Sequence, residues 1–485
     1  MDVDATDLLI LQELEAAIAQ SDDPDAQIRS INELKKLAKT PPLSPFTFKI
    51  LSVLKKFLAT SRIPRSESKI DDVVVLAASC ALWSYTWLKL EYQTNVELDD
   101  ACVDILPDAL RWIDFLHARY FGDDWQGRRF GENIWGAALT FLDMSVGHYR
   151  MFSMAGENIT RQIVHFWVQE ARLDNRLYVK HLPSRILQKL IVCHGEERED
   201  LIVSAMESVG ASVAARTAVS QLSTITGTDS DKHLMETRNE TLLIRILACN
   251  GTLVHHLLAM GAIRVLVKTL AYATRESYTD DPSTRGIMIW IVQNICEALQ
   301  VAIGQTTGVA FARQVLSFGI LAPLLRADKW HKHLTPKHFP GAPYIHVGLL
   351  IQILATYTIY PSVLHSAVVA IEEVPVKLQN RLDKAGPMTS AWKTFKNVVE
   401  SRSKIPGAPP RPFDISRCSN LSCSARGTRN TESKRCAGCG DALYCGPACQ
   451  KVDWQNHRNT CRELQALTFG ASQAILRYYL HNVGL

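Results

Sequence analysis

The residues of this chain best suited to chemistry lie near its C-terminal end. Seven of the twelve cysteines fall between residues 418 and 461. With one histidine they form four short pairs: Cys418/Cys423, Cys436/Cys439, Cys445/Cys449 and His457/Cys461. Eight such donors suffice for two tetrahedral Zn²⁺ sites, and thiolates favour zinc over calcium or magnesium. The spacing therefore predicts a segment that binds two zinc ions.

The same spacing bears on the role of the metal. A secreted disulfide protein would spread its cysteine pairs along the chain, whereas short paired spacings in one cluster indicate metal ligands. A zinc ion with four protein ligands has no open position for water or substrate, so we expect structural sites and no catalytic residues here. Cys445/Cys449 and His457/Cys461 are each four residues apart, which would place each pair on one face of a helix, and Pro447 suits a helix start. Spacing alone permits either sequential or interleaved pairing.

This segment resembles the MYND zinc finger. The resemblance is carried by the tract Tyr444-Cys445-x3-Cys449-Gln450-x2-Asp453-Trp454-x2-His457-x3-Cys461. It implies interleaved sites, with Cys418, Cys423, Cys445 and Cys449 on one zinc and Cys436, Cys439, His457 and Cys461 on the other. The first pair departs from the family pattern, because its members are more often separated by two residues than by four.

The resemblance also implies a binding role. MYND fingers are generally protein-interaction modules that bind short proline-rich peptides as an added strand. Residues matching Gln450 and Trp454 contribute to the peptide surface in peptide-binding members, although Trp454 could instead be a core residue of the finger. Some of these peptides have the form Pro-x-Leu-x-Pro, which also describes Pro41–Pro45, although the favoured interpretation of that segment is an ordinary helix-breaking linker with Ser44 as N-cap.

Nucleic acid is not an expected partner of the finger. Residues 411–461 contain eight Lys/Arg and four Asp/Glu. A zinc with four thiolates carries a charge of −2 and one with three thiolates carries −1, so the metal-loaded segment is left at about +1. That charge attracts phosphate weakly.

The first 400 residues are predicted to be helical. Apolar residues recur at helical spacing in segment after segment, and strand signals are sparse. The clearest stripes cover residues 8–17, 28–37, 45–58, 71–90, 102–119, 130–153, 158–171, 176–194 and 234–249. Two stretches, around Gly261 and Gly319, share a helix–glycine–helix layout, and a weaker third surrounds Gly210. This layout resembles the armadillo repeat, and we expect an irregular armadillo/HEAT-like array. A globular helical domain with two coincidental glycine turns is the alternative.

The predicted domain order follows from these patterns. Residues 1–400 form the helical region, residues 401–417 a proline-rich linker, residues 418–461 the zinc finger and residues 462–485 a C-terminal amphipathic helix. The most apolar stretch, Val73–Leu88, is judged too short to cross a bilayer, and the acidic N-terminus lacks the basic region of a secretory signal. We therefore expect an intracellular protein, in either the cytoplasm or the nucleus, without a membrane partner.

The function expected from the sequence is that of a zinc-binding adaptor that uses the finger and a helical-repeat surface. A transcription or chromatin co-regulator that recruits proline-rich partners is the alternative. A SET-type lysine methyltransferase is disfavoured because the finger lacks strand-rich flanks. Cys193 and His194 are adjacent on a predicted helix, so their side chains diverge and do not form a nucleophilic pair.

Overall fold

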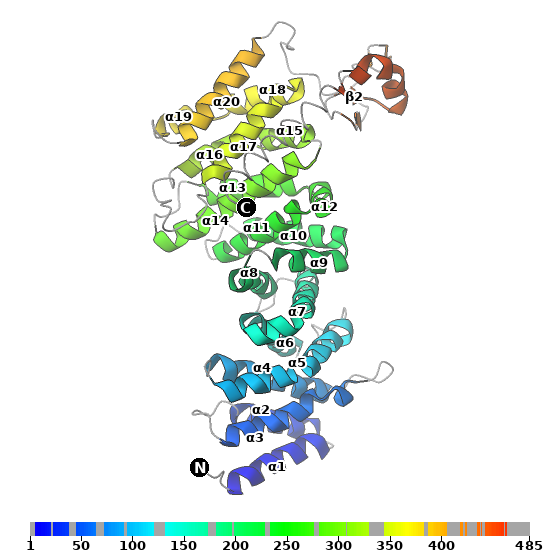
Figure 1. Ribbon diagram of the computed structural model, residues 1–485, viewed down its shortest axis with the longest axis vertical. Coiled ribbons are helices and arrows are strands. Elements are labelled where there is room, and N and C mark those ends of the chain that lie inside the picture. Colours follow the sequence, from blue (N-terminus) through cyan, green and yellow to red (C-terminus); the bar gives the residue numbers. More distant parts are fainter. Residues whose placement is uncertain are drawn as a thin grey trace. The chain divides into compact units, whose positions relative to one another are not determined.

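A computed structural model of the chain contains two compact units, Met1–Gly210 and Ala211–Leu485 (Figure 1). We call them the N-terminal and the C-terminal unit. The structure describes residues 5–20, 23–37, 45–64, 72–91, 95–120, 131–172, 181–195, 198–227, 233–275, 281–306, 308–328, 344–382, 387–404, 418–420, 422–423, 434–436, 438, 442–459 and 461–462. The predicted mostly α fold class is confirmed by these residues.

The N-terminal unit is built from helices that pack on neighbours close in sequence. They are α1 (Ala5–Gln20), α2 (Pro24–Leu37), α3 (Pro45–Leu58), α4 (Asp72–Glu91), α5 (Val96–Phe115), α6 (Gly131–Gly147), α7 (Tyr149–Glu170), α8 (Leu182–His194) and α9 (Glu199–Ser208). A 3₁₀ turn, Thr60–Arg62, follows α3, and a π-helical turn, Leu116–Tyr120, continues α5. Trp112, Trp135 and Trp167 are fully buried between these helices, so burial of apolar surface stabilises the unit.

One helix boundary differs from the apolar pattern. The stripes predicted a break between residues 153 and 158, but α7 begins at Tyr149, after the N-cap residue His148, and continues to Glu170. The predicted break is a kink at Ala155, whose φ and ψ are −143° and 22°. Gly156 follows the kink, and its carbonyl accepts a hydrogen bond from the Thr160 hydroxyl at 2.7 Å. Glycine and back-bonding hydroxyls are common causes of helix bending.

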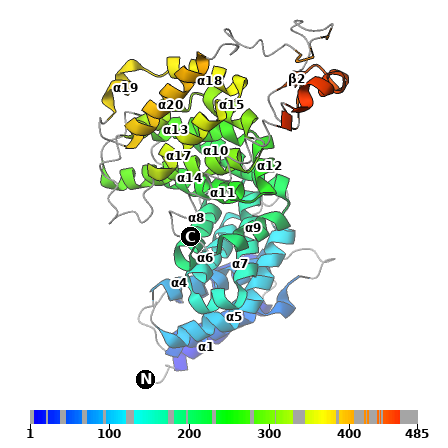
Figure 2. The same cartoon turned by 45° about the horizontal axis from the view of Figure 1, so that its top comes forward.

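The C-terminal unit begins with α10 and continues the helical pattern (Figure 2). Its helices are α10 (Ala211–Gly227), α11 (Leu234–Cys249), α12 (Leu253–Ala259), α13 (Ala262–Ala273), α14 (Pro282–Gly304), α15 (Val309–Ser317), α16 (Leu321–Ala327), α17 (Tyr344–Tyr357), α18 (Pro361–Glu372), α19 (Val376–Arg381) and α20 (Pro387–Ser403). Two short strands, β1 (Lys434–Arg435) and β2 (Leu443–Tyr444), belong to the cysteine-rich segment.

The glycine turns noted in the sequence are the corners of helix triplets. Gly261 and Gly319 have φ angles of 80° and 78°, and the helices on either side of them are bent by 77° and 74°. Gly210, directly before α10, has a φ of 97°. The left-handed region is open to glycine at little cost, so glycine permits the sharp corner. The resulting triplets are α12–α13–α14 and α15–α16–α17.

Equivalent helices of successive triplets pack on one another. Among the third helices, α11 packs on α14, α14 on α17 and α17 on α20. Among the second helices, α10 packs on α13, α13 on α16 and α16 on α19. This order describes a repeat array and not two coincidental turns. It also adds a triplet that the sequence did not reveal, α18–α19–α20, in which Val374 and Pro375 stand at the corner in place of glycine.

The structure corrects the start of the predicted linker. Helix α20 continues to Ser403, three residues into the segment 401–417, because the first proline of that segment is Pro406 and nothing before it interrupts the helix. Outside the described residues lie residues 405–417, residues 463–485 of the C-terminal helix predicted over 462–485, and residues 41–44 of the proline motif.

Among the described residues, two helices are long and apolar enough to cross a membrane, which corrects the expectation that the stretch at Val73–Leu88 is too short. They are Asp72–Leu90 within α4 and Thr284–Gly304 within α14, and the bent pairs α12–α13 and α15–α16 would pass the same test if each pair were one span. In each of the two long helices, 67% of the apolar 18-residue stretch is buried inside the protein. Packing on both faces accounts for the apolar composition.

We predict that Gly261→Ala lowers the free energy of unfolding by about 1–2 kcal/mol, because an L side chain is strained in the left-handed region. Nothing lies within 4 Å of the position a Cβ would take, so backbone strain is the only added cost. Gly251→Ala is the matched control, because Gly251 is also unobstructed and lacks a positive φ. Equal losses for the two variants in urea-induced unfolding would contradict this assignment.

Two partly buried histidines face each other in the N-terminal unit. The ring centroids of His117, which follows α5, and His165 of α7 are 4.5 Å apart. Burial lowers the pKa of His117 to about 4, and repulsion from His165 and Arg172 adds to the effect. Burial also lowers the pKa of His165. The folded state therefore prefers both rings neutral.

The pair should make stability depend on pH. The folded pKa of His117 is lower than its unfolded value, so its contribution is complete above about pH 6.5 and declines as the pH falls towards 4. When the pH is lowered from about 7.5 to about 5, the free energy of unfolding measured with urea should fall less for His117→Asn than for the wild type. His255→Asn, which changes an exposed histidine of the other unit, should behave as the wild type. An identical pH dependence in all three proteins would exclude the histidine pair as the cause.

Candidate metal centre

A small antiparallel hairpin and one helix position the cysteines. In the hairpin, Lys434 pairs with Tyr444 and Arg435 with Leu443. Helical residues 447–459 begin at Pro447, as the sequence predicted, and the first helical bond runs from the Gln450 N–H to the Gly446 carbonyl at 3.3 Å. Cys445 lies before this helix at the end of β2, so the prediction that Cys445 and Cys449 share a helix face is wrong. Proline at 447 starts the helix too late to include Cys445.

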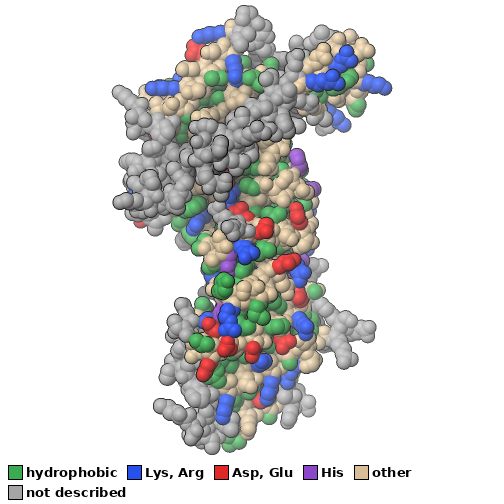
Figure 3. Space-filling model, in the orientation of Figure 1, with side chains coloured by type: hydrophobic (Ala, Val, Ile, Leu, Met, Phe, Trp, Pro, Cys, Tyr) green, Lys and Arg blue, Asp and Glu red, His purple; other side chains and the backbone are tan. Residues whose placement is uncertain are grey.

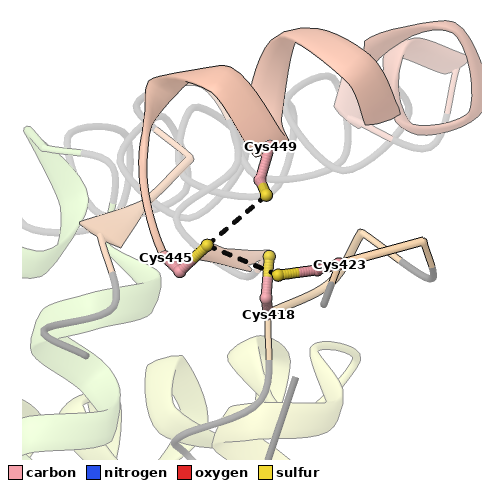
Figure 4. Close-up of side chains that lie close together, drawn as sticks. All are labelled: Cys418, Cys423, Cys445 and Cys449. Atoms are coloured by element: carbon pink, nitrogen blue, oxygen red, sulfur yellow. Dashed lines mark hydrogen bonds between the residues drawn. The ribbon is translucent and has the colours of Figure 1, made fainter. Parts of the chain in front are cut away.

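The four sulfurs of Cys418, Cys423, Cys445 and Cys449 converge on one point (Figure 4). All lie within 4.8 Å of one another. The Cys445 sulfur is 3.5 Å from that of Cys423 and 3.4 Å from that of Cys449. Four sulfurs bound to one zinc at 2.3 Å would be about 3.8 Å apart in a tetrahedron. The spacing therefore fits a zinc site with four cysteine ligands, whose sulfurs come from a loop, a strand end and a helix.

A turn at Asn420 accommodates the longer spacing between Cys418 and Cys423, which are separated by four residues. The Asn420 side-chain oxygen accepts a hydrogen bond from the Ser422 N–H at 3.0 Å, and its backbone carbonyl accepts one from the Cys423 N–H at 3.1 Å. Asparagine stabilises such turns because its side chain hydrogen-bonds the backbone two residues later. The turn returns Cys423 to the side of Cys418, so the departure from the usual spacing does not separate these two sulfurs.

A second cluster contains Cys436, His457 and Cys461, whose ligand atoms also lie within 4.8 Å of one another. The sulfurs of Cys436 and Cys461 are 3.8 Å apart. The fourth residue expected here, Cys439, lies outside the described residues. The two clusters are interleaved along the chain, which is the grouping that the resemblance implied and that spacing alone left open. Together they fit two zinc ions.

Without a bound cation, the closely spaced thiols are more stable in their protonated form. Hydrogen bonds with Cys449 and then with Cys423 raise the pKa of Cys445 to about 12. Zinc binds thiolates and releases these protons, so its binding strengthens as the pH rises. When bound, each ion would supply a positive centre that holds separate segments of the chain together, and the four sulfurs of the first cluster would leave that ion no position for a reacting group.

Residues around the ligands complete the site. The Tyr444 side chain is 1% exposed, and its hydroxyl donates to Asp453 Oδ2 at 2.8 Å. This bond connects β2 to the helix. The Gln450 side-chain amide lies 3.6 Å from the Cys436 sulfur, where it donates to a ligand of the second cluster. The sequence predicted Gln450 only as part of a peptide surface, and the family tract that contains Tyr444 and Asp453 predicted no role for either residue.

Trp454 is a surface residue of this segment. Its side chain is 42% exposed, and that of Val452 on the same helix is 65% exposed. The Trp454 ring meets the His457 ring edge-on at a centroid distance of 6.1 Å. The alternative in which Trp454 is a core residue is therefore not supported. An exposed tryptophan fixed against a metal ligand offers a rigid apolar contact.

Within the described part of the finger, the buried interior consists almost entirely of metal ligands. The buried cluster consists of Cys418, Cys436, Cys461 and Tyr444. So small an apolar interior cannot offset the entropy of ordering the loops. Binding of the two ions must supply that free energy, which is of order 10–16 kcal/mol per structural zinc in peptides.

We predict that the purified protein contains two zinc ions per chain, because the described donors form two clusters. Cys449→Ala should reduce the content to one ion or fewer. Cys193→Ala, which removes an exposed cysteine far along the sequence, should retain both ions. Inductively coupled plasma mass spectrometry measures the content. Two ions in Cys449→Ala, or fewer than two in the wild type, would contradict the assignment.

Comparison with known proteins agrees with this geometry. Residues 417–461 match the family model of the MYND finger. The F-box protein At1g67340 of Arabidopsis thaliana is 41% identical to the chain over 49 residues, which are 10% of this chain and 13% of that protein. The chain thus spans about an eighth of the length of this relative, and the likeness is confined to a short segment. On the family match and the two ligand clusters, residues 417–461 of this chain are a MYND zinc finger.

Proposed function

We propose that the protein is a non-enzymatic adaptor whose MYND finger, stabilised by two structural zinc ions, binds a short proline-rich peptide of a partner protein. The observation that carries the proposal is the exposed Trp454, held against the zinc ligand His457 on a helix that also exposes Val452. Large apolar side chains exposed on a rigid module are typical of peptide-binding surfaces.

The hairpin provides an edge for an added strand. The outer edge of β2 is engaged, because the Ser419 N–H donates to the Leu443 carbonyl at 2.6 Å and the Ser419 hydroxyl accepts from the Leu443 N–H at 2.9 Å. Among the described residues, nothing pairs with the outer edge of β1. A peptide added as a strand would therefore pair with Lys434 and Arg435.

Charge on the finger supports a protein partner over nucleic acid. The space-filling view shows Lys and Arg side chains on the exposed face of the segment that carries β2 (Figure 3). Lys434, Lys451 and Arg458 are exposed. Bound zinc leaves four thiolates with a net −2 and three thiolates with −1, which offsets most of this charge. A weakly positive surface beside an exposed tryptophan suits a peptide better than a phosphate backbone.

Two observations support a role without catalysis. The His194 ring is stacked on Phe152 at 3.9 Å, and its Nε2 lies 2.7 Å from the Val146 carbonyl, so it is engaged away from Cys193. Strands within the described residues are limited to β1 and β2, whereas a SET domain requires a larger sheet.

An intracellular location suits reduced zinc thiolates. A co-regulator in the nucleus would use the same finger.

We predict that Trp454→Ala weakens peptide binding by about tenfold or more, because it removes an aromatic contact. The probe is a labelled peptide with the sequence Pro-Pro-Leu-Ser-Pro of residues 41–45, and the readout is fluorescence anisotropy with the full chain. Val452→Ala is the control, since it truncates a more exposed but smaller side chain on the same helix and should weaken binding less.

Both variants should still contain two zinc ions. Weaker peptide binding would then reflect the loss of a contact and not unfolding of the finger. Replacing leucine by alanine in the peptide should also weaken binding. If the wild type fails to bind the peptide, or if Trp454→Ala binds it as tightly as the wild type, proline-rich recognition by this surface is excluded.

A further inference from the structure

Five neighbouring helices of the repeat array in the C-terminal unit contain no acidic residue. Helices α10, α12, α13, α15 and α16, which are first and second helices of the triplets, contain no Asp or Glu. They carry five basic residues: Arg216, Arg264, Lys268, Arg313 and Arg326. The neighbouring third helices α11 and α14 differ, because α11 carries Glu236 and Glu240 and α14 carries Glu297. The surface formed by α10, α12, α13, α15 and α16 is therefore positive.

A groove of about 560 Å³ lies on this surface. It is bordered by three helices that the packing places together, with α10 against α13 and α13 against α15 (Figure 2). Helix α10 contributes one face, which includes Arg216, Ser220 and Ser223. The corner at Gly261 contributes Arg264, and the corner at Gly319 contributes Phe318. The glycine corners thus shape the groove as well as the repeats.

The two arginines of the groove are available to a ligand. Arg216 and Arg264 are exposed and form no ion pair with any described residue. Elsewhere in the unit, Arg245 lies 3.3 Å from Glu297 and is thereby neutralised. An arginine without a carboxylate partner keeps its full positive charge and its planar set of donors for a carboxylate from another molecule.

Apolar side chains accompany the arginines. Phe318 is 42% exposed, and Met260 and Val265 are half-buried beside it. The backbone N–H of Phe318 donates to the Gln314 carbonyl at 2.9 Å, which fixes the base of the exposed ring. An exposed aromatic ring in the same groove as two arginines is typical of a peptide contact with both apolar and charged parts.

We propose that this groove binds an acidic segment of a partner protein, with its Asp or Glu carboxylates on Arg216 and Arg264 and an apolar side chain on Phe318. The apolar lining and the small number of unpaired cations favour a peptide over nucleic acid, which requires a longer row of cations. The groove deepens the proposed adaptor function by assigning a second recognition surface. This inference depends on the proposed function only for its cellular role. Groove and finger can be tested independently, because different variants alter them.

The test selects peptides from a random displayed library on the immobilised full chain. Enrichment of sequences that combine several Asp or Glu with a large apolar residue is expected. The best such peptide, labelled, should bind Arg216→Glu and Arg264→Glu at least about tenfold more weakly than the wild type, and higher salt should weaken wild-type binding. Phe318→Ala should weaken binding by a similar factor.

Arg185→Glu is the matched control, because Arg185 is an exposed arginine of α8 in the other unit and its replacement introduces the same charge change. Trp454→Ala, which alters only the finger, should bind the acidic peptide as the wild type does. Circular dichroism should confirm that each variant is folded. Failure to enrich acidic sequences, equal weakening by Arg185→Glu, or tighter binding of a single-stranded oligonucleotide than of the peptide would overturn the proposal.

Discussion

Sulfur atoms held close together without a cation are an unstable arrangement unless they are protonated. In this protein four sulfurs from a loop, a strand end and a helix lie within 4.8 Å of one another, and a second cluster lies in the same short segment. The buried residues of the finger are largely the ligands themselves. The path of the chain, the position of the hairpin and the exposure of Trp454 therefore depend on the bond between zinc and thiolate.

The helical units depend on a different interaction. Each helix has more apolar surface than it can bury by itself, and the next helices along the chain cover it. Glycine enters where the chain must turn sharply, and Val374 with Pro375 turns the last triplet without it. Since stability is built from neighbouring contacts, the outer surfaces of the array are free to vary. The acid-free helices α10, α13 and α15 form one such surface.

Much of the finger could be predicted because its information is local. Ligand types and spacings within 44 residues indicate zinc, and the apolar stripes indicate the helical segments from α1 to α8 and α11. The exposure of Trp454 could not be read from its neighbours, because it depends on how the helix lies on His457. Sequence spacing also placed Cys445 on a helix that starts at Pro447. The groove was not predictable, since its residues come from helices about a hundred positions apart and meet only through repeat packing.

The alternation of the two ligand sets along the chain has a consequence for the way the finger loads. The Cys436 ligand lies between the two halves of the all-cysteine set, and Cys445 and Cys449 lie between the two halves of the other set. Each ion thus closes a loop that brings donors for the other nearer together, so binding of the first ion lowers the entropic cost of binding the second. The two ions should therefore load cooperatively, over a narrower range of free zinc than two independent sites.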